Sequence, residues 1–206
     1  ISSALVSLVE RDKLGDVKDF FKAAVLRLVG RLGFAVTVVP MVSDASRWSL
    51  SERRQYQEAL DCTRYLWSPA GYWQAPAQSR AIRREYFEAI GQDPARLIFL
   101  DVDVGLSFTQ ATLDRRHVRL EDVELLLCQR PRRIVMVYQN WAQRNTDWGT
   151  SPQDYVLQRI QNRSLARTVV TNPHAAMLFL SRTSVRSIRQ HLRRCFRANW
   201  RERVPW

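Results

Sequence analysis

Residues 120–138 read LEDVELLLCQRPRRIVMVY, and this stretch decides the fold. Leu120–Gln129 predicts a helix, because Glu121 and Asp122 stand in its first turn, where the helix dipole favours anions. Ile134–Tyr138 is a short apolar run that predicts a strand. A helix that leads within a few residues into a buried strand is typical of α/β proteins.

The same alternation extends in both directions along the chain. Apolar residues recur at helical spacing from Val17 to Leu32, and Gly33 is a plausible stop. Further helices are predicted at Ser51–Tyr65, Ser79–Ile90, Pro152–Gln161 and Ser184–Trp200, and strands at Phe34–Val39, Leu97–Leu100, Arg167–Thr171 and Ala175–Leu180. The last two strands are joined through Asn172-Pro173-His174, which predicts a hairpin.

Strands that alternate with helices predict a mostly parallel sheet with helices on both faces. We therefore expect a single Rossmann-like domain over residues 1–206. It would have three layers, α/β/α, and a C-terminal antiparallel hairpin. Residues 182–203 would form an arginine-rich closing helix.

Composition excludes several classes of protein. The chain of 206 residues is 46% hydrophobic and 25% charged, so it can bury a core and is not a disordered tail. No apolar run approaches the roughly 18 residues that cross a bilayer, so we expect no membrane partner. Cys62, Cys128 and Cys195 form no CxxC pair, which indicates neither a zinc cluster nor a disulfide framework. A cytoplasmic protein without a metal site is the expectation.

Net charge points to a polyanionic partner. Lys and Arg total 32 against 20 Asp and Glu, a net of +12, which favours nucleic acid, an anionic membrane or an acidic protein. On the predicted closing helix, five arginines fall within an arc of about 80° and form a candidate phosphate-binding ribbon: Arg182, Arg186, Arg189, Arg193 and Arg197. A solvated helix face with ion partners elsewhere in the fold is the alternative.

Two carboxylates follow the strand Leu97–Leu100. Asp101 ends this strand and Asp103 stands two residues later. Ligand sites of open α/β sheets gather at the carboxyl ends of strands. Such a pair can bind a divalent cation or act as acid and base, whereas a turn-capping role for Asp101 is the structural alternative.

The start of the first long helix holds a second group. Asp16 can cap this helix, with Asp19 at the third helical position, and Lys22 is placed for an i,i+3 ion pair with Asp19. Alternatively, the helix N-terminus and Lys22 bind an anionic ligand.

A third group follows the strand Ile134–Tyr138. Tyr138, Gln139 and Asn140 combine an aromatic ring with two amides. They can stack on and hydrogen-bond a base or an adenosyl group, or else they complete the packing at the end of the sheet.

Three blocks together resemble a family of uncharacterised bacterial proteins whose blocks read GDxxDxxKxxLLR, FFDPDNGL and YQHFPR. Here they are GDxxDxxK (Gly15, Asp16, Asp19, Lys22), DxDxGL (Asp101, Asp103, Gly105, Leu106) and Tyr138-Gln139. That family's opening is similar to the GNxADVxKH opening of small ribosomal-RNA adenine methyltransferases, and its DPDN block stands where those enzymes carry the catalytic DPPY loop. The resemblance implies a class I methyltransferase-like fold, S-adenosylmethionine as cofactor and a nucleic-acid substrate.

The chain departs from these patterns at catalytic positions. Val102 and Val104 replace the proline and asparagine of the DPDN block, and Asn140 replaces the histidine of YQH. The glycine-rich cofactor loop is replaced by residues 39–44, VPMVSD. These differences favour a degenerate member that binds without reacting.

Three functions remain open from the sequence. The first is a nucleic-acid-binding, methyltransferase-like domain, active or not, with Asp101, Asp103 and Lys22 at the reaction centre. Its cofactor-binding residues would be Asp16, Asp19, Tyr138, Gln139 and Asn140. The second is a Mg²⁺-dependent nuclease in which Asp101 and Asp103 hold the ion and Lys22 stabilises the developing phosphorane charge. The third is a non-catalytic module whose arginine ribbon docks an acidic protein, as part of a larger complex.

Overall fold

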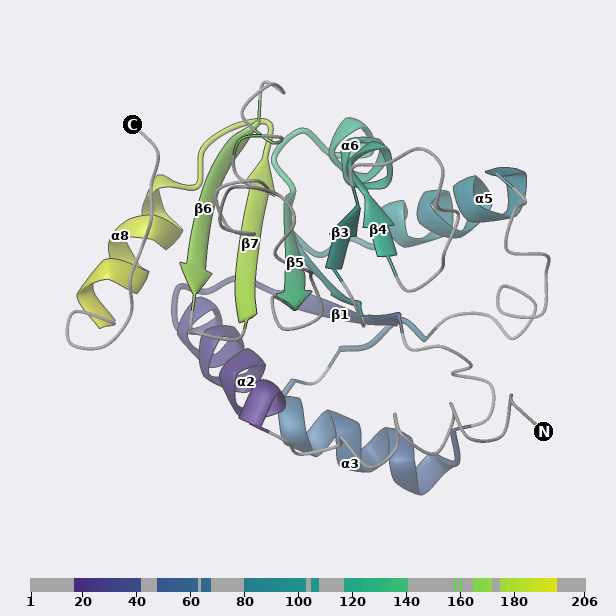
Figure 1. Ribbon diagram of the computed structural model, residues 1–206, viewed down its shortest axis with the longest axis horizontal. Helices are drawn as coiled ribbons and strands as arrows, with labels where there is room; N and C mark the ends of the chain where they lie inside the picture. Colours follow the sequence, from purple (N-terminus) through teal and green to yellow (C-terminus); the bar gives the residue numbers. More distant parts are fainter. Residues whose placement is uncertain are drawn as a thin grey trace, which may run out of the picture.

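The computed structural model describes residues 17–41, 48–62, 64–67, 80–102, 105–107, 117–140, 165–171 and 175–195, together with residues 158 and 160. They form an α/β fold with a mixed sheet of five strands (Figure 1). The α/β class predicted from the sequence is therefore confirmed, whereas the sheet is mixed rather than mostly parallel. None of the described helices combines the length and the apolar composition needed to cross a membrane.

The sheet has the strand order β1-β2-β5-β7-β6. Its first three strands, β1 (Val36–Met41), β2 (Leu97–Val102) and β5 (Ile134–Asn140), are parallel. The last two, β6 (Ala166–Thr171) and β7 (Ala175–Ser181), form the predicted antiparallel pair. β7 also pairs antiparallel with β5, so it lies between two strands that both run opposite to it.

Residues 64–67 extend the sheet beyond β1. The Val38 N–H donates to the Arg64 carbonyl at 2.9 Å, and the Leu66 N–H donates to the Val38 carbonyl at 2.9 Å. The predicted helix Ser51–Tyr65 is therefore too long. The helix α3 (Leu50–Leu60) ends at Asp61, whose φ of 49° places it in the left-handed region and turns the chain back toward the sheet.

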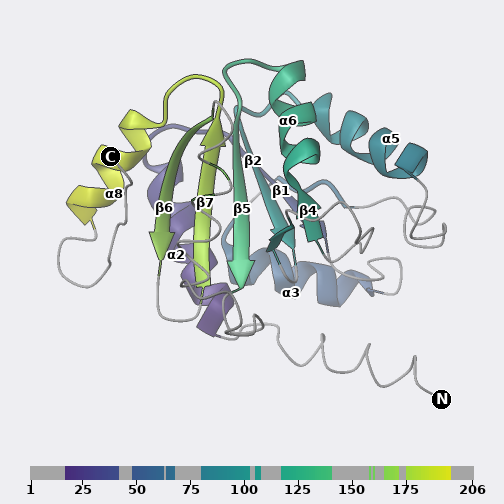
Figure 2. The same cartoon turned by 45° about the horizontal axis from the view of Figure 1, so that its top comes forward.

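Helices cover both faces of the sheet (Figures 1 and 2). The helices α2 (Val17–Gly30), α3 and α8 (Arg186–Cys195) pack on one face, and α5 (Arg80–Gly91) and α6 (Leu120–Gln129) on the other. Because both faces are covered, strands such as β2 and β7 are buried along their whole length and read as continuous apolar runs.

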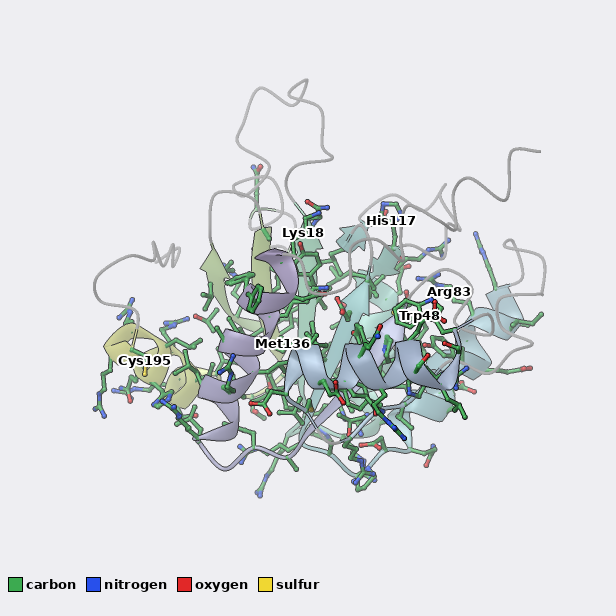
Figure 3. The ribbon with its side chains drawn as sticks, turned by 90° about the horizontal axis from the view of Figure 1, so that it is seen from below. Lys18, Trp48, Arg83, His117, Met136 and Cys195 are labelled. Atoms are coloured by element: carbon green, nitrogen blue, oxygen red, sulfur yellow. The ribbon has the colours of Figure 1, made fainter. Side chains whose placement is uncertain are left out.

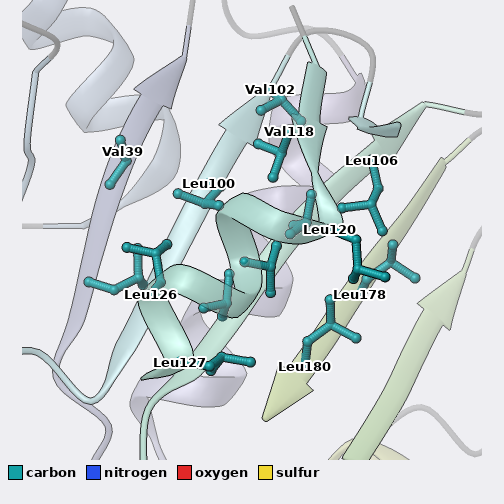
Figure 4. Close-up of a cluster of buried hydrophobic side chains, with 14 of the residues drawn as sticks. Val39, Leu100, Val102, Leu106, Val118, Leu120, Leu126, Leu127, Leu178 and Leu180 are labelled. Atoms are coloured by element: carbon teal, nitrogen blue, oxygen red, sulfur yellow. The ribbon is translucent and has the colours of Figure 1, made fainter. Parts of the chain in front are cut away.

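Each face has its own hydrophobic core, to which alternate residues of a strand contribute. In β2, Ile98 and Leu100 belong to the core under α5 and α6, whereas Leu97 and Phe99 belong to the core under α2, α3 and α8. Figure 4 shows the first core, with Leu126 of α6 packed over the sheet. Burying each such side chain stabilises the fold by about 1.5–3 kcal/mol.

The predicted start of α3 was too late in the sequence, and local hydrogen bonds explain the true start. The cap of α3 is Ser49, two residues before the predicted Ser51. Its hydroxyl accepts from the Glu52 N–H at 3.2 Å, and its own N–H donates to the Glu52 carboxylate at 2.6 Å. This reciprocal pair is a capping box, which fixes where α3 begins.

Several boundaries differ from the prediction. α2 ends at Gly30 rather than Leu32, and β2 and β5 are two residues longer than predicted, so Asp101, Gln139 and Asn140 lie inside strands rather than after them. The short parallel strands β3 (Gly105–Ser107) and β4 (His117–Arg119) were not predicted, because three residues are too few to show a period. Of the helix predicted at Pro152–Gln161, residues 158 and 160 are helical and the others lie outside the described residues.

A buried ion pair joins α5 to α6. Arg83 donates from Nε to both carboxylate oxygens of Asp122 at 3.1 Å, and from NH2 to the His117 carbonyl at 2.8 Å. The Arg119 N–H donates to the same carboxylate at 2.7 Å. Both charged side chains are about nine-tenths buried, so each one depends on the other for compensation of its charge.

Replacing one partner of this pair should destabilise the protein strongly. We expect Asp122→Asn to lower the free energy of unfolding by about 3–5 kcal/mol, because it leaves a buried guanidinium without a counter-charge. Urea unfolding measures the change. Arg84→Gln, which removes an exposed i,i+4 pair with Glu88, is the matched control and should have almost no effect. Equal losses in the two variants would contradict the account.

Candidate functional site

Lys22 is the centre of a polar cluster at the carboxyl edge of the sheet. From the second turn of α2, its ammonium contacts Asp19 Oδ1 at 3.1 Å and Asp101 Oδ1 at 2.9 Å. It also lies over the Tyr138 ring, 4.6 Å from the ring centroid. The predicted i,i+3 pair with Asp19 is confirmed, and the structure adds contacts to β2 and β5.

Asp101 is held by two donors from opposite sides. Besides Lys22, the Tyr56 hydroxyl of α3 donates to Asp101 Oδ2 at 2.5 Å. Asp101 is only 4% exposed, and its position in β2 sets it beside Tyr138 of β5. One carboxylate of β2 thus binds side chains from two helices.

Burial and charge shift the proton affinities within this cluster. Burial alone would lower the pKa of Lys22, but the neighbouring charges of Asp101 and Asp19 outweigh it and raise that pKa, so Lys22 stays protonated. Burial raises the pKa of Asp101 above the ordinary aspartate value, against the opposing effects of Lys22 and the Tyr56 hydrogen bond. Burial and the Asp101 charge likewise raise the pKa of Tyr56.

Tyr138 and Gln139 lie on opposite faces of the sheet. Successive residues of a strand alternate in direction, so Tyr138 belongs to the α2–α3 face with Asp101, and Gln139 faces the other side. There Gln139 Oε1 accepts from the Leu106 N–H at 2.8 Å. Asn140 is buried at the end of β5, and its carbonyl accepts from Gln139 Nε2 at 3.4 Å. The three residues grouped in the sequence therefore do not line one pocket wall.

Gly105 allows Gln139 to reach β3. Its φ of +117° is a conformation that side-chain-bearing residues rarely adopt. A Cβ at this position would lie 2.5 Å from the Gln139 amide carbon. The glycine of the DxDxGL block is thus explained by close packing of β3 against β5.

An aromatic cluster surrounds Tyr56 and was not recognised as part of the site. Trp48 and Trp67 both lie 5.7 Å from the Tyr56 ring, and Tyr65 lies 5.9 Å from it. Arg53 covers Trp67, at 5.0 Å from the ring centroid. These rings come from before, within and after α3, so no local sequence pattern indicated that they would gather around Tyr56.

The described residues do not fit S-adenosylmethionine at this edge. β1 ends in Pro40 and buried Met41, with no glycine to allow close approach of a ligand. At the α3 N-terminus, the Glu52 carboxylate already bonds the Ser49 N–H, so an anionic ligand group would meet a negative charge there. The charged groups of Lys22 and Asp101 are engaged with one another.

Divalent-cation binding is also not favoured by the geometry of Asp101. The Lys22 ammonium contacts both of its oxygens, at 2.9 and 3.1 Å, where a metal ion would have to bind. Among the described residues, no group of three His, Cys, Asp or Glu side chains is arranged to hold a metal. Asp16 and Asp103 lie outside the described residues.

The arginines of α8 are separate from this cluster. α8, which carries Cys195, lies on the far side of α2 from Trp48 (Figure 3). α8 begins at Arg186 rather than at the predicted residue 182, so Arg182, which directly follows β7, is not on the helix. Arg182, Arg186 and Arg193 are exposed, whereas Arg189 is half-buried and donates to the Arg167 carbonyl of β6 at 2.8 Å. The predicted ribbon is thus interrupted at Arg189, and Arg197 lies outside the described residues.

No protein-family model, curated protein or solved structure matches the chain. Function is therefore inferred from the geometry itself.

Removing the Lys22 charge should make stability depend on pH. In Lys22→Met, the pKa of Asp101 should rise further, because the cation that lowers it is gone. Between the unfolded-state and folded-state pKa values of Asp101, the folded state would then hold a proton that the unfolded state has released. The free energy of unfolding should therefore fall as pH rises through this range, by up to about 1.4 kcal/mol per pH unit.

Chemical denaturation at a series of pH values from about 4 to 7 measures this slope. Lys18→Met removes a lysine from the same helix and is the matched control. A Lys22→Met slope equal to that of the control would contradict the assigned ion pair.

Proposed function

We propose that the chain is a nucleic-acid-binding domain of Rossmann-like, methyltransferase-like architecture whose Lys22–Asp101 cluster is structural rather than catalytic. The proposal rests on the hydrogen bonding and the burial of Asp101. Both of its oxygens are bonded within the protein, and the carboxylate is buried. A general base or metal ligand needs a lone pair that faces its reactant, and here the donors are Lys22 and Tyr56.

The sheet supports the architectural part of this proposal. Antiparallel β7 lies between the parallel strands β5 and β6, and a final antiparallel strand is the arrangement of class I methyltransferases. The segment Arg64–Trp67 adds a further short parallel pairing beyond β1. The helices on both faces agree with a three-layer α/β/α domain.

Charge supports the nucleic-acid part. The net charge of +12 is large for 206 residues, and it is carried mainly by arginine, whose planar guanidinium binds phosphate through two parallel hydrogen bonds. A nuclease mechanism through Asp101 is disfavoured, because Mg²⁺ would have to displace Lys22 from a buried carboxylate.

Nucleic-acid binding, S-adenosylmethionine binding and nucleic-acid cleavage should be measured on the same protein preparation. Fluorescence anisotropy with labelled single-stranded RNA, duplex RNA and duplex DNA should show binding whose logarithm falls linearly with the logarithm of salt concentration. Calorimetry with S-adenosylmethionine should show no binding heat, and incubation with Mg²⁺ should leave the nucleic acid intact.

The double variant Lys22→Met with Asp101→Leu tests the structural role directly. It replaces the pair by apolar side chains, and we expect its nucleic-acid affinity to stay within about twofold of wild type, because phosphate contacts dominate such binding. Cleavage or methyl transfer by the wild type that this variant loses would overturn the non-catalytic assignment. Absence of nucleic-acid binding by the wild type would overturn the binding function.

A further inference from the structure

A second charged surface lies at the opposite edge of the sheet, where the parallel strands begin. Arg96 directly precedes β2, Arg132 stands two residues before β5, and Arg182 directly follows β7. Arg130 lies at the end of α6, and Arg186 begins α8. All five side chains are exposed. In Figure 2, this edge is where β7 ends and β5 begins.

Hydrogen bonds at the strand ends make the positions of Arg96, Arg132 and Arg182 neighbours. The Ile134 N–H donates to the Arg96 carbonyl at 2.8 Å, which sets the start of β5 beside the start of β2. The Ser181 hydroxyl donates to the Arg133 carbonyl at 2.9 Å, which joins the end of β7 to the same place. Adjacent strands are about 4.8 Å apart, so the row from β2 to β7 spans about 10 Å on a rigid sheet edge.

The structure gives these arginines no carboxylate partner among the described residues. Arg96 covers the Phe34 ring at 5.1 Å, Arg130 donates to the Gln92 carbonyl at 3.4 Å, and Arg182 donates to Cys128 Sγ at 2.9 Å. The nearby carboxylate of Asp93 is buried and receives the Thr37 hydroxyl, the Ala95 N–H and Arg64 instead. The row therefore presents positive charge that described neighbours do not neutralise.

Helix and strand dipoles account for only one of these five exposed arginines. A cation at a helix C-terminus is favoured by the dipole, which explains Arg130. Arg186, in contrast, stands in the first turn of α8, where a cation is disfavoured. Arg96, Arg132 and Arg182 flank strands, which have almost no net dipole.

Buried Arg133 and half-buried Arg167 add further positive charge on this side of the sheet. Burial and the neighbouring Arg130 lower the pKa of Arg133, whose Nε is buried without a hydrogen-bond partner. Burial and Arg189 lower the pKa of Arg167. Cations near other cations are costly unless an external anion compensates them.

We propose that the amino edge of the sheet, with Arg96, Arg130, Arg132, Arg182 and Arg186, is the surface that binds the phosphate backbone of the nucleic acid. The inference rests on the proposed nucleic-acid-binding function. It keeps Arg182 and Arg186 of the predicted ribbon and replaces Arg189 and Arg193 of α8 by arginines of the sheet edge. A duplex carries about one negative charge per 1.7 Å of its axis, so a surface about 10 Å wide faces several phosphates at once. The surface of a folded acidic protein seldom offers so regular a row of anions.

Neutralising the row tests the proposal. The triple variant Arg96→Gln, Arg132→Gln, Arg182→Gln should bind labelled duplex RNA or DNA at least about tenfold more weakly near 0.1 M salt, with a salt slope reduced by about 2–3. The matched control, Arg54→Gln, Arg80→Gln, Arg84→Gln, removes the same charge from exposed positions on α3 and α5 and should retain most of the affinity.

The outcomes separate this inference from the proposed function. If the wild type binds nucleic acid and the two triple variants weaken binding equally, the edge is not the contact surface, although the proposed function stands. Loss of binding only in Arg189→Gln with Arg193→Gln would return the contact to the α8 ribbon. Tighter binding of poly-glutamate than of either duplex would overturn the choice of partner. Circular dichroism confirms that each variant is folded.

Discussion

The Lys22–Asp101 ion pair is the interaction on which the carboxyl edge depends. It joins α2 to β2 across 79 residues of sequence, and Tyr56 brings α3 to the same carboxylate. Burying either charge alone would cost several kcal/mol, so the pair forms only where the helices and the strand meet in one register. A buried ion pair of this kind fixes how the helices and the strand pack, more than it stabilises the fold. It also places protein donors on both oxygens of the buried Asp101 carboxylate.

Opposite edges of the sheet therefore have different electrostatic roles. At the carboxyl edge, the Lys22 ammonium is paired inside the protein with the carboxylates of Asp19 and Asp101. At the amino edge, arginines such as Arg132 and Arg182 are exposed, and the described carboxylate nearby, Asp93, is already bonded.

Sequence patterns predicted the features that depend on neighbouring residues in the chain. They missed the features that depend on residues far apart in sequence. Leu120–Gln129 was predicted to the residue, because acids mark its first turn and apolar spacing marks its length. The Asp19–Lys22 pair was predicted from i,i+3 spacing. The ends of β2 and β5 were missed, because Asp101 and Gln139 are polar residues that are buried only through bonds to Lys22 and to the Leu106 N–H. For the same reason, no local signal placed Tyr56 beside Asp101, or β7 between β5 and β6.

A double-mutant cycle on Lys22 and Asp101 tests the central claim most directly. Free energies of unfolding are measured for the wild type, Lys22→Met, Asp101→Leu and the double variant at neutral pH. A buried pair that fixes the register should give a coupling free energy of at least about 1.5 kcal/mol, with the double variant more stable than the sum of the single losses predicts. Losses that add to within about 0.5 kcal/mol would show that the two side chains act independently, and would contradict this account of the fold and of its function.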